Sequence, residues 1–180
     1  MKALTLTQPW ATLIACGAKR IETRSWSTSY RGALAIHAAK GLAPVGGKRG
    51  FQEQCATPPF EQVLSKWFEE FGATKSAYKA GWVMPLGAVV AVGRLVAVKP
   101  TSMALRAELL AQTITPHEID FGDYSNGRFA WYLENVSFLE QPIECSGALS
   151  IWDLSPEIEA AVTAQLTKLT KGVSVITWKP

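Results

Sequence analysis

The sequence predicts an α+β fold in which a small mixed, barrel-like β-sheet carries peripheral helices. Apolar and β-branched runs of strand length recur along the chain, and helical stretches of unequal length separate them. A doubly wound parallel sheet would need a more regular alternation of strands and helices. An apolar content of 48% with 18% charged residues is typical of a folded globular protein.

The N-terminal part of the chain predicts two strands around a short helix. Ala3–Leu6 has the character of a strand, and Thr7 is placed to cap a helix whose first turn contains Pro9. Gly17 is expected to end this helix, because glycine is favoured just beyond a helix C-terminus. The segment Ile21–Trp26 is predicted to be the second strand.

The middle of the chain predicts a strand, a loop, a helix and a long central strand. A turn at 30–32 leads into a strand at 33–38, and the segment 40–57 is rich in glycine and lysine, which predicts a loop. Apolar residues at helical spacing predict a core-packed helix over 60–71. The β-branched run 86–98 predicts a central strand, with Gly93 marking a bend or bulge.

The last third of the chain predicts further elements of both kinds. Met103–Gln112 suggests a helix, and the turn-forming residues Phe121–Arg128 lead into a strand at Phe129–Val136. After Pro142 the pattern predicts a strand at 149–154, a helix over about 156–169 and a strand at 173–178.

Composition restricts the class of protein. The chain has 180 residues, a formal net charge of +3, three widely spaced cysteines and two histidines. Neither a disulfide framework nor a metal site is expected from so few ligands. No signal peptide or membrane-spanning run is recognisable, and neither a P-loop nor a Gly-x-Gly-x-x-Gly motif is present, so we expect a cytoplasmic protein without a cofactor.

The segment Gly17–Trp26 carries the most informative side chains. If the strand is extended, Glu22, Arg24 and Trp26 share one face, and Lys19 stands at its entrance. A carboxylate, a guanidinium and an indole on one face can hydrogen-bond the edge of a nucleobase and stack on its ring. An edge strand with an ordinary Glu–Arg pair is the alternative.

Two further residues are candidates for binding. Trp10, at the start of the first helix, could stack a base, although a tryptophan in this position more often packs in the core. Arg128 opens the strand that carries Trp131, which suits a clamp for a phosphate or carboxylate group.

Four segments occur in a characteristic order: Leu4–Ala11, Gly17–Trp26 with the following 30–38, Leu86–Ala91 and Phe121–Trp131. Together they resemble the ASCH family (the activating-signal-cointegrator homology domain) of the PUA-like superfamily. The resemblance runs from Ala3 to about Leu154. It implies one PUA-like domain over 1–180, with a less typical insertion around 40–80 and a C-terminal helix–strand extension around 156–180.

The resemblance implies a small β-barrel with helices flanking a cleft and a role in handling RNA or modified nucleobases. Within the family, some members look like RNA-binding modules, some have been described as ribonucleases, and small bacterial members hydrolyse N4-acylated cytidines. We therefore expect RNA or a modified nucleoside as the partner. An N4-acylcytidine amidohydrolase, a ribonuclease and a protein-interaction module with a vestigial cleft remain as alternatives.

The resemblance also bears on catalysis. Lys19 matches the lysine of the small amidohydrolases, but the position of their threonine nucleophile holds Glu22 here, so that mechanism cannot be transferred intact. Glu22 could instead activate a water molecule, with Lys19 stabilising the oxyanion. Binding of a polar edge without chemistry is the competing interpretation.

The resemblance places the turn before Trp131 at the mouth of the cleft. Ser125 is its best spare hydroxyl for a nucleophile, and Glu118, Asp120 and Asp123 compete for the role of the distant carboxylate. Asp123 and Ser125 could equally cap the backbone of their own turn.

Overall fold

The structure is a computed structural model that describes residues 1–70, 84–112, 115 and 117–171. The strand expected at 173–178 lies outside the described residues. Every other expected strand is present, and the expected combination of a mixed sheet with peripheral helices is confirmed.

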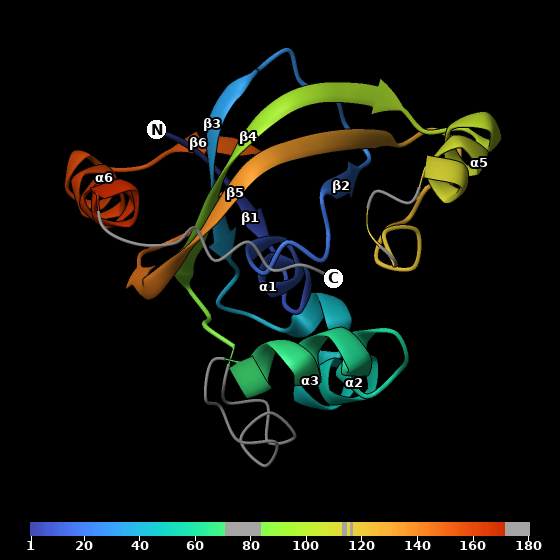
Figure 1. The fold of residues 1–180 in the computed structure, drawn as a ribbon, viewed down its shortest axis with the longest axis horizontal. Coiled ribbons are helices and arrows are strands. Elements are labelled where there is room, and N and C mark those ends of the chain that lie inside the picture. The colour runs from blue at the N-terminus through green and yellow to red at the C-terminus, as the bar shows by residue number, and fades with distance from the viewer. Residues whose placement is uncertain (71–83, 113–114, 116, 172–180) are drawn as a thin grey trace.

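The six-stranded sheet has the order β2-β5-β4-β3-β1-β6 and curls around one helix (Figure 1). Only β1 and β3 pair in parallel; the other neighbouring strands pair antiparallel. The two edge strands of the sheet are therefore β2 and β6. The strands are β1 (Lys2–Leu6), β2 (Ile21–Arg24), β3 (Gly32–Ala38), β4 (Ala88–Pro100), β5 (Phe129–Glu144) and β6 (Ile151–Asp153).

The helices surround the sheet on several sides. In Figure 1, α1 lies inside the curl, α2 and α3 lie beyond it, and α5 and α6 stand near opposite ends of the sheet. The helices are α1 (Trp10–Ala15), α2 (Gly47–Cys55), α3 (Phe60–Glu70), α5 (Met103–Gln112) and α6 (Pro156–Lys171), with a 3-10 turn, η1, at Ala43–Val45.

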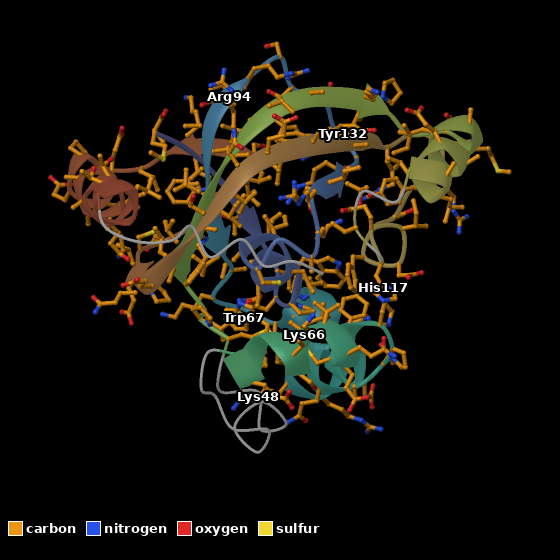
Figure 2. All side chains as sticks on the ribbon, viewed as in Figure 1. Lys48, Lys66, Trp67, Arg94, His117 and Tyr132 are labelled. Atoms are coloured by element: carbon orange, nitrogen blue, oxygen red, sulfur yellow. The ribbon has the colours of Figure 1, made fainter. Side chains whose placement is uncertain are left out.

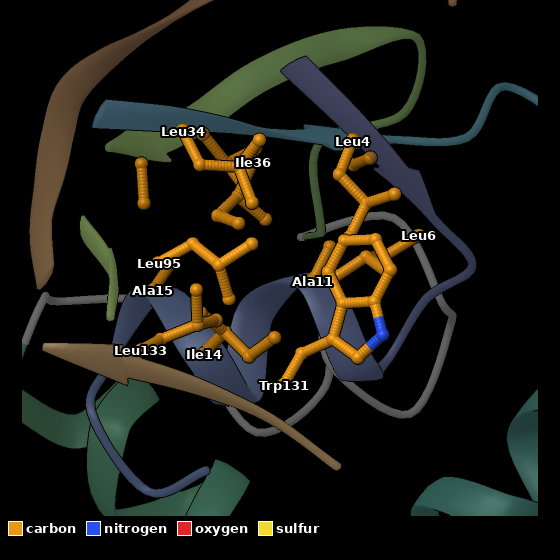
Figure 3. Close-up of a cluster of buried hydrophobic side chains, with 13 residues drawn as sticks. Leu4, Leu6, Ala11, Ile14, Ala15, Leu34, Ile36, Leu95, Trp131 and Leu133 are labelled. Carbon is orange, nitrogen blue, oxygen red and sulfur yellow. The ribbon is translucent and has the colours of Figure 1, made fainter. Parts of the chain in front are cut away.

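The main core fills the space between the inner face of the sheet and α1 (Figure 3). Trp131 of β5, Leu4 of β1 and Ile14 of α1 are each at most 1% exposed. Burial of each large apolar side chain contributes about 1.5–3 kcal/mol. This packing fixes the inner face of β5, against which β2 is paired.

The ends of α1 differ partly from expectation. Thr7 does not cap the helix: the N-cap is Pro9, and the buried Gln8 side chain accepts the N–H of Thr12 at 3.1 Å. The amide of Gln8 therefore replaces the expected hydroxyl, since it reaches the first turn from outside the helix. Gly17 follows the helix with a φ of +78°, as expected for a terminating glycine.

The prediction of a loop over 40–57 is wrong, because most of this segment forms η1 and α2. Phe51 and Cys55, one turn apart, are buried against α3 and α1. A Cβ at Gly50 would lie 1.9 Å from the carbonyl oxygen of Val45, so glycine allows η1 to pack on α2. Tertiary packing thus overrides the low helix propensity of the glycines.

The long β4–β5 ribbon contains the expected irregularity at Gly93. The register shifts between Val92 and Arg94, and a Cβ at Gly93 would lie 3.0 Å from a methyl carbon of Val136. β5 continues to Glu144, beyond the end predicted at Val136, because its pairing with β4 resumes after the shifts. The expected strand at 149–154 is shorter, at Ile151–Asp153.

Candidate ligand site at strand β2

The pairing of β2 with β5 decides where its side chains point. Glu22 lies opposite Trp131, which belongs to the inner core cluster, so Glu22 and Arg24 share that face. Ile21 packs instead in the cluster with α5, which places Thr23 on the same outer side. The predicted shared face of Glu22 and Arg24 is therefore observed.

Lys19 does not join Glu22. Its side chain is 0% exposed, its ammonium donates to the carbonyl oxygen of Ile21, and its Nζ lies 3.7 Å from Oε1 of Glu118. A buried ammonium requires this pairing, because an isolated charge in the interior is strongly unfavourable.

The carboxylate of Glu118 accepts hydrogen bonds from several donors. It accepts the backbone N–H groups of Arg20 at 2.7 Å and Ile21 at 3.1 Å. Its oxygens also accept the hydroxyls of Thr115 at 3.2 Å and Tyr124 at 3.3 Å. Of the distant carboxylates considered, Glu118 is the one that contacts Lys19, and its lone pairs are used in holding β2.

Tyr124 supplies a neutral donor to this network. Burial, followed by the negative charge of Glu118 and the hydrogen bond to it, raises the pKa of Tyr124 well above its ordinary value. The phenol therefore remains protonated at all physiological pH values and donates to the carboxylate.

Glu22 and Arg24 form a second pair with different surroundings. The Nε of Arg24 lies 3.5 Å from Oε1 of Glu22, and the two side chains retain 27% and 10% exposure. An Nη of Arg24 donates to the carbonyl oxygen of Thr5 at 2.7 Å, but its buried Nε has no hydrogen-bond partner. No described residue donates a hydrogen bond to the Glu22 carboxylate.

The turn before β5 packs against the outer side of β2. The backbone N–H of Asp123 donates to the hydroxyl of Thr23 at 3.1 Å, and an Nη of Arg128 donates to the Thr23 carbonyl oxygen, also at 3.1 Å. The Nε of Arg128 lies 3.3 Å from Oδ2 of Asp123. Arg128 is thus already paired, and much of its charge is compensated within the turn.

Ser125 is directed into its own turn. Its N–H donates to Asp123 at 3.0 Å, and its carbonyl oxygen accepts the hydroxyl of Thr101. Hydrogen bonds from Ser125 are the main cause of the lowered pKa of Asp123. The structure brings Ser125 to Asp123 and Thr101, whereas Lys19 is surrounded by Ile21 and Glu118. Asp120 lies elsewhere and pairs with His117, labelled in Figure 2.

The two candidate stacking residues have separate surroundings. Trp26 meets Trp131 edge to face, with ring centroids 4.6 Å apart, beside the strand face of Glu22 and Arg24. Trp10 donates its indole N–H to the carbonyl oxygen of Phe121 at 2.8 Å and packs against Phe60. Trp26 therefore accompanies the Glu22–Arg24 pair, and Trp10 belongs to the α2–α3 core.

Sequence reasoning missed how the outer edge of β2 is closed. Leu133 N–H bonds to the carbonyl oxygen of Arg20, so the antiparallel alternation turns the N–H and C=O of Ile21 outward. Glu118 accepts that N–H and Lys19 donates to that C=O, while Arg128 bonds the next outward carbonyl oxygen, that of Thr23. These charged side chains block the edge against another strand. Nothing local in the sequence indicates the roles of Thr115 and Tyr124.

The described part of the chain offers neither a metal site nor a membrane-spanning helix. Among the described residues, no group of three or more His, Cys, Asp or Glu side chains is arranged to hold a metal ion. In the same part of the chain, none of the helices combines the length and apolar character needed to cross a membrane.

Comparison with known proteins relates this arrangement to others. A crystal structure of a mutant of ZmASCH from Zymomonas mobilis has a TM-score of 0.50 at 13% identity and covers 91% of this chain and 96% of that chain. The crystal structure of ASCH from Zymomonas mobilis has a TM-score of 0.48 at 15% identity, covering 93% and 94%. The first of these likenesses shows a shared fold, in agreement with the α+β arrangement expected from the sequence.

A curated relative and the domain profile identify the family. Activating signal cointegrator 1 of Mus musculus is 54% identical over 41 residues, which are 23% of this chain and 7% of that protein. The chain thus matches only a small part of that relative. The ASCH domain profile matches residues 4–143, and the chain belongs to the ASCH domain family.

Proposed function

We propose that this ASCH domain binds a nucleobase, in a modified nucleoside or an unpaired nucleotide of RNA, beside Glu22 and Arg24. The observation that carries the proposal is the partly open Glu22–Arg24 pair, in which the buried Nε of Arg24 has no hydrogen-bond partner and the Glu22 carboxylate accepts from no described residue. Buried polar groups usually have hydrogen-bond partners, and those without one often belong to a functional site. The buried Nε of Arg128 also lacks a hydrogen-bond partner, but that side chain bonds the turn before β5 and the outer side of β2.

Recognition depends on the base more than on phosphate groups. Three of the four cations at β2 have a carboxylate partner: Lys19 with Glu118, Arg24 with Glu22, and Arg128 with Asp123. The exposed Arg20 adds a single positive charge, which is little to attract a phosphate backbone. We therefore expect binding that changes little with salt, in contrast to binding through many phosphate contacts. Trp26, which is partly exposed, supplies an aromatic surface next to the pair.

Binding without hydrolysis agrees best with the state of Lys19 and Glu118. Lys19 is fully buried and donates to a backbone carbonyl, and Glu118 accepts from two amides and two hydroxyls. A mechanism in which Glu22 activates a water needs a cation beside it to stabilise the oxyanion, and the Lys19 ammonium is directed to Ile21 and Glu118 instead. The side chain of Ser125, the hydroxyl considered as a nucleophile, hydrogen-bonds Asp123, and its backbone bonds Asp123 and Thr101.

The test compares binding and turnover in one set of samples. Calorimetry would measure the binding of cytidine and of a short single-stranded RNA to the whole chain at several salt concentrations, and chromatography would follow N4-acetylcytidine. We expect binding with a shallow salt dependence and no turnover. Failure of both ligands to bind would overturn the proposal, and hydrolysis of N4-acetylcytidine would replace it with the amidohydrolase.

Matched arginine variants locate the site. Arg24→Ala should weaken binding about tenfold to a hundredfold, because it removes hydrogen bonds from a charged donor. Arg94→Ala removes the same charge from an exposed position on β4 (Figure 2) and should leave affinity unchanged. Equal effects of the two variants would argue against a site at β2.

A further inference from the structure

The Glu22–Arg24 pair presents a directional pattern of hydrogen-bonding groups. The Glu22 carboxylate only accepts, the Arg24 guanidinium only donates, and Oε1 of the one lies 3.5 Å from Nε of the other. Both side chains leave the same face of β2, so they can meet neighbouring positions on one edge of a planar ligand.

The fixed anchoring of Arg24 gives this pattern a defined orientation. One Nη donates to the Thr5 carbonyl oxygen on β1, which ties the guanidinium across the inside of the sheet. The backbone of β2 is held from the other side by Glu118. Neither Glu22 nor Arg24 can therefore exchange places with the other to accept a ligand of the opposite pattern.

Cytosine, adenine and uracil differ in how they would meet an acceptor beside a donor. The exocyclic amine of cytosine can donate to a carboxylate while the adjacent ring nitrogen accepts from arginine; the amine and ring nitrogen of adenine offer the same order. In uracil the single ring N–H stands between two carbonyl oxygens. Uracil can offer this N–H to Glu22 and one carbonyl oxygen to Arg24, but the second carboxylate oxygen then approaches the other carbonyl oxygen, which is repulsive.

Acylation of the cytosine amine has a similar effect. It removes one of the two N–H donors and adds a carbonyl oxygen that cannot donate to Glu22. Resting on the proposed function, we infer that Glu22 selects a base with a free exocyclic amine, of the cytosine or adenine type, over uracil and over N4-acylated cytosine. Glu22 is then the specificity-determining residue of the site.

The experiment is a ranking of nucleosides with a charge-neutral, nearly isosteric variant. Calorimetry would give the affinities of cytidine, adenosine, uridine and N4-acetylcytidine for the wild-type chain and for Glu22→Gln. In the wild type, cytidine and adenosine should bind at least about tenfold more tightly than uridine and N4-acetylcytidine, since leaving a buried polar group unpaired costs about 1–3 kcal/mol. In Glu22→Gln, whose amide can donate to a carbonyl oxygen, the preference should shrink or reverse toward uridine.

A control and the opposing outcomes complete the test. Glu134→Gln makes the same change at an exposed position of β5 and should keep the wild-type ranking. Wild-type binding of uridine or N4-acetylcytidine as tight as that of cytidine would overturn this inference alone, as would a ranking unchanged in Glu22→Gln. Absence of binding by every nucleoside would overturn the proposed function and the inference together.

Discussion

Two pairs of opposite charge stand a few residues apart at β2 and have opposite surroundings. The Lys19–Glu118 pair is buried, and Glu118 accepts hydrogen bonds from two backbone amides and two hydroxyls. The Glu22–Arg24 pair is partly open, and no described residue hydrogen-bonds its carboxylate. The first pair has the properties of a structural element and the second those of a recognition element.

The difference shows why the same residue types serve different purposes within one short segment. A buried charge is tolerated when its partners are complete, and removal of one partner is then strongly destabilising. A charge pair with unused hydrogen-bonding capacity adds little to stability but can be completed by a ligand. Variants of the two pairs should therefore differ in whether they lose stability or affinity.

The largest expected effect is the loss of stability in Glu118→Ala. This variant leaves the Lys19 ammonium buried without its anion and two β2 amides without their acceptor. We expect the free energy of unfolding in denaturant titrations to fall by about 3–5 kcal/mol. Glu22→Ala should lower it by less than about 1 kcal/mol, because its partner Arg24 is partly solvated. Similar losses for the two variants would remove the distinction.

Removal of the buried cation should have a smaller effect than removal of the anion. Lys19→Met replaces the side chain with an apolar one of similar length, and Glu118 keeps its four hydrogen bonds. We expect a loss of about 1–3 kcal/mol, mainly from the unpaired carboxylate and the Ile21 carbonyl oxygen. Thermal and chemical unfolding would measure it. A variant as stable as the wild type would mean that the ammonium is not needed there.

Tyr124→Phe removes a single hydrogen-bond donor from the Lys19–Glu118 pair. The ring and its packing remain, and only the hydroxyl that donates to Glu118 is lost. A decrease of about 0.5–1.5 kcal/mol in the free energy of unfolding is expected. Nucleoside affinity should stay within about twofold of the wild type, because the phenol does not contact the ligand. A larger loss of affinity than of stability would indicate that Tyr124 belongs to the recognition element.

His37, a buried histidine on the other face of the sheet, predicts how the stability of the protein depends on pH. Its Nε2 bonds the Cys145 carbonyl oxygen, its Nδ1 has no partner, and Gly147 covers the ring. Burial, opposed in part by the bond to Cys145, lowers the pKa of His37. As the pH falls below about 6.5, the unfolded chain therefore takes up a proton before the folded chain does, and stability decreases.

Unfolding measured between pH 7.5 and about 5 should show this decrease in the wild type and a weaker one in His37→Gln. His117→Ala, at a partly exposed histidine paired with Asp120, is the control and should keep the wild-type slope. If His117→Ala flattens the slope and His37→Gln does not, the assignment to His37 is wrong.

Much of the fold could be predicted from local patterns. The β-branched run with Gly93 became the bulged strand β4, and the helical spacing of 60–71 became α3. Alternation along β2 correctly placed Glu22 and Arg24 on one face. The helix α2 could not be predicted, because its glycines disfavour a helix and the packing of Phe51 and Cys55 that stabilises it is a tertiary contact.

The arrangement of side chains around β2 could be predicted only in part for a related reason. The sequence places Lys19 close to Glu22, but the ion-pair partner of Lys19 is Glu118. Glu118 also accepts the backbone N–H of Arg20, which lies 98 residues earlier in the chain. Such a contact depends on how the turn before β5 folds against β2. Only the structure shows that both Asp123 and Arg128 donate hydrogen bonds to Thr23 on the outer side of the strand.

Carbon-13 NMR of a chain labelled at the glutamate side-chain carboxyl carbons tests the central claim most directly. Resonances of Glu22 and Glu118 would be assigned with Glu22→Gln and Glu118→Gln and followed as cytidine is added. We predict that the Glu22 resonance moves in a saturable manner while that of Glu118 stays in place. A moving Glu118 resonance with a stationary Glu22 resonance would contradict the assignment of the two pairs.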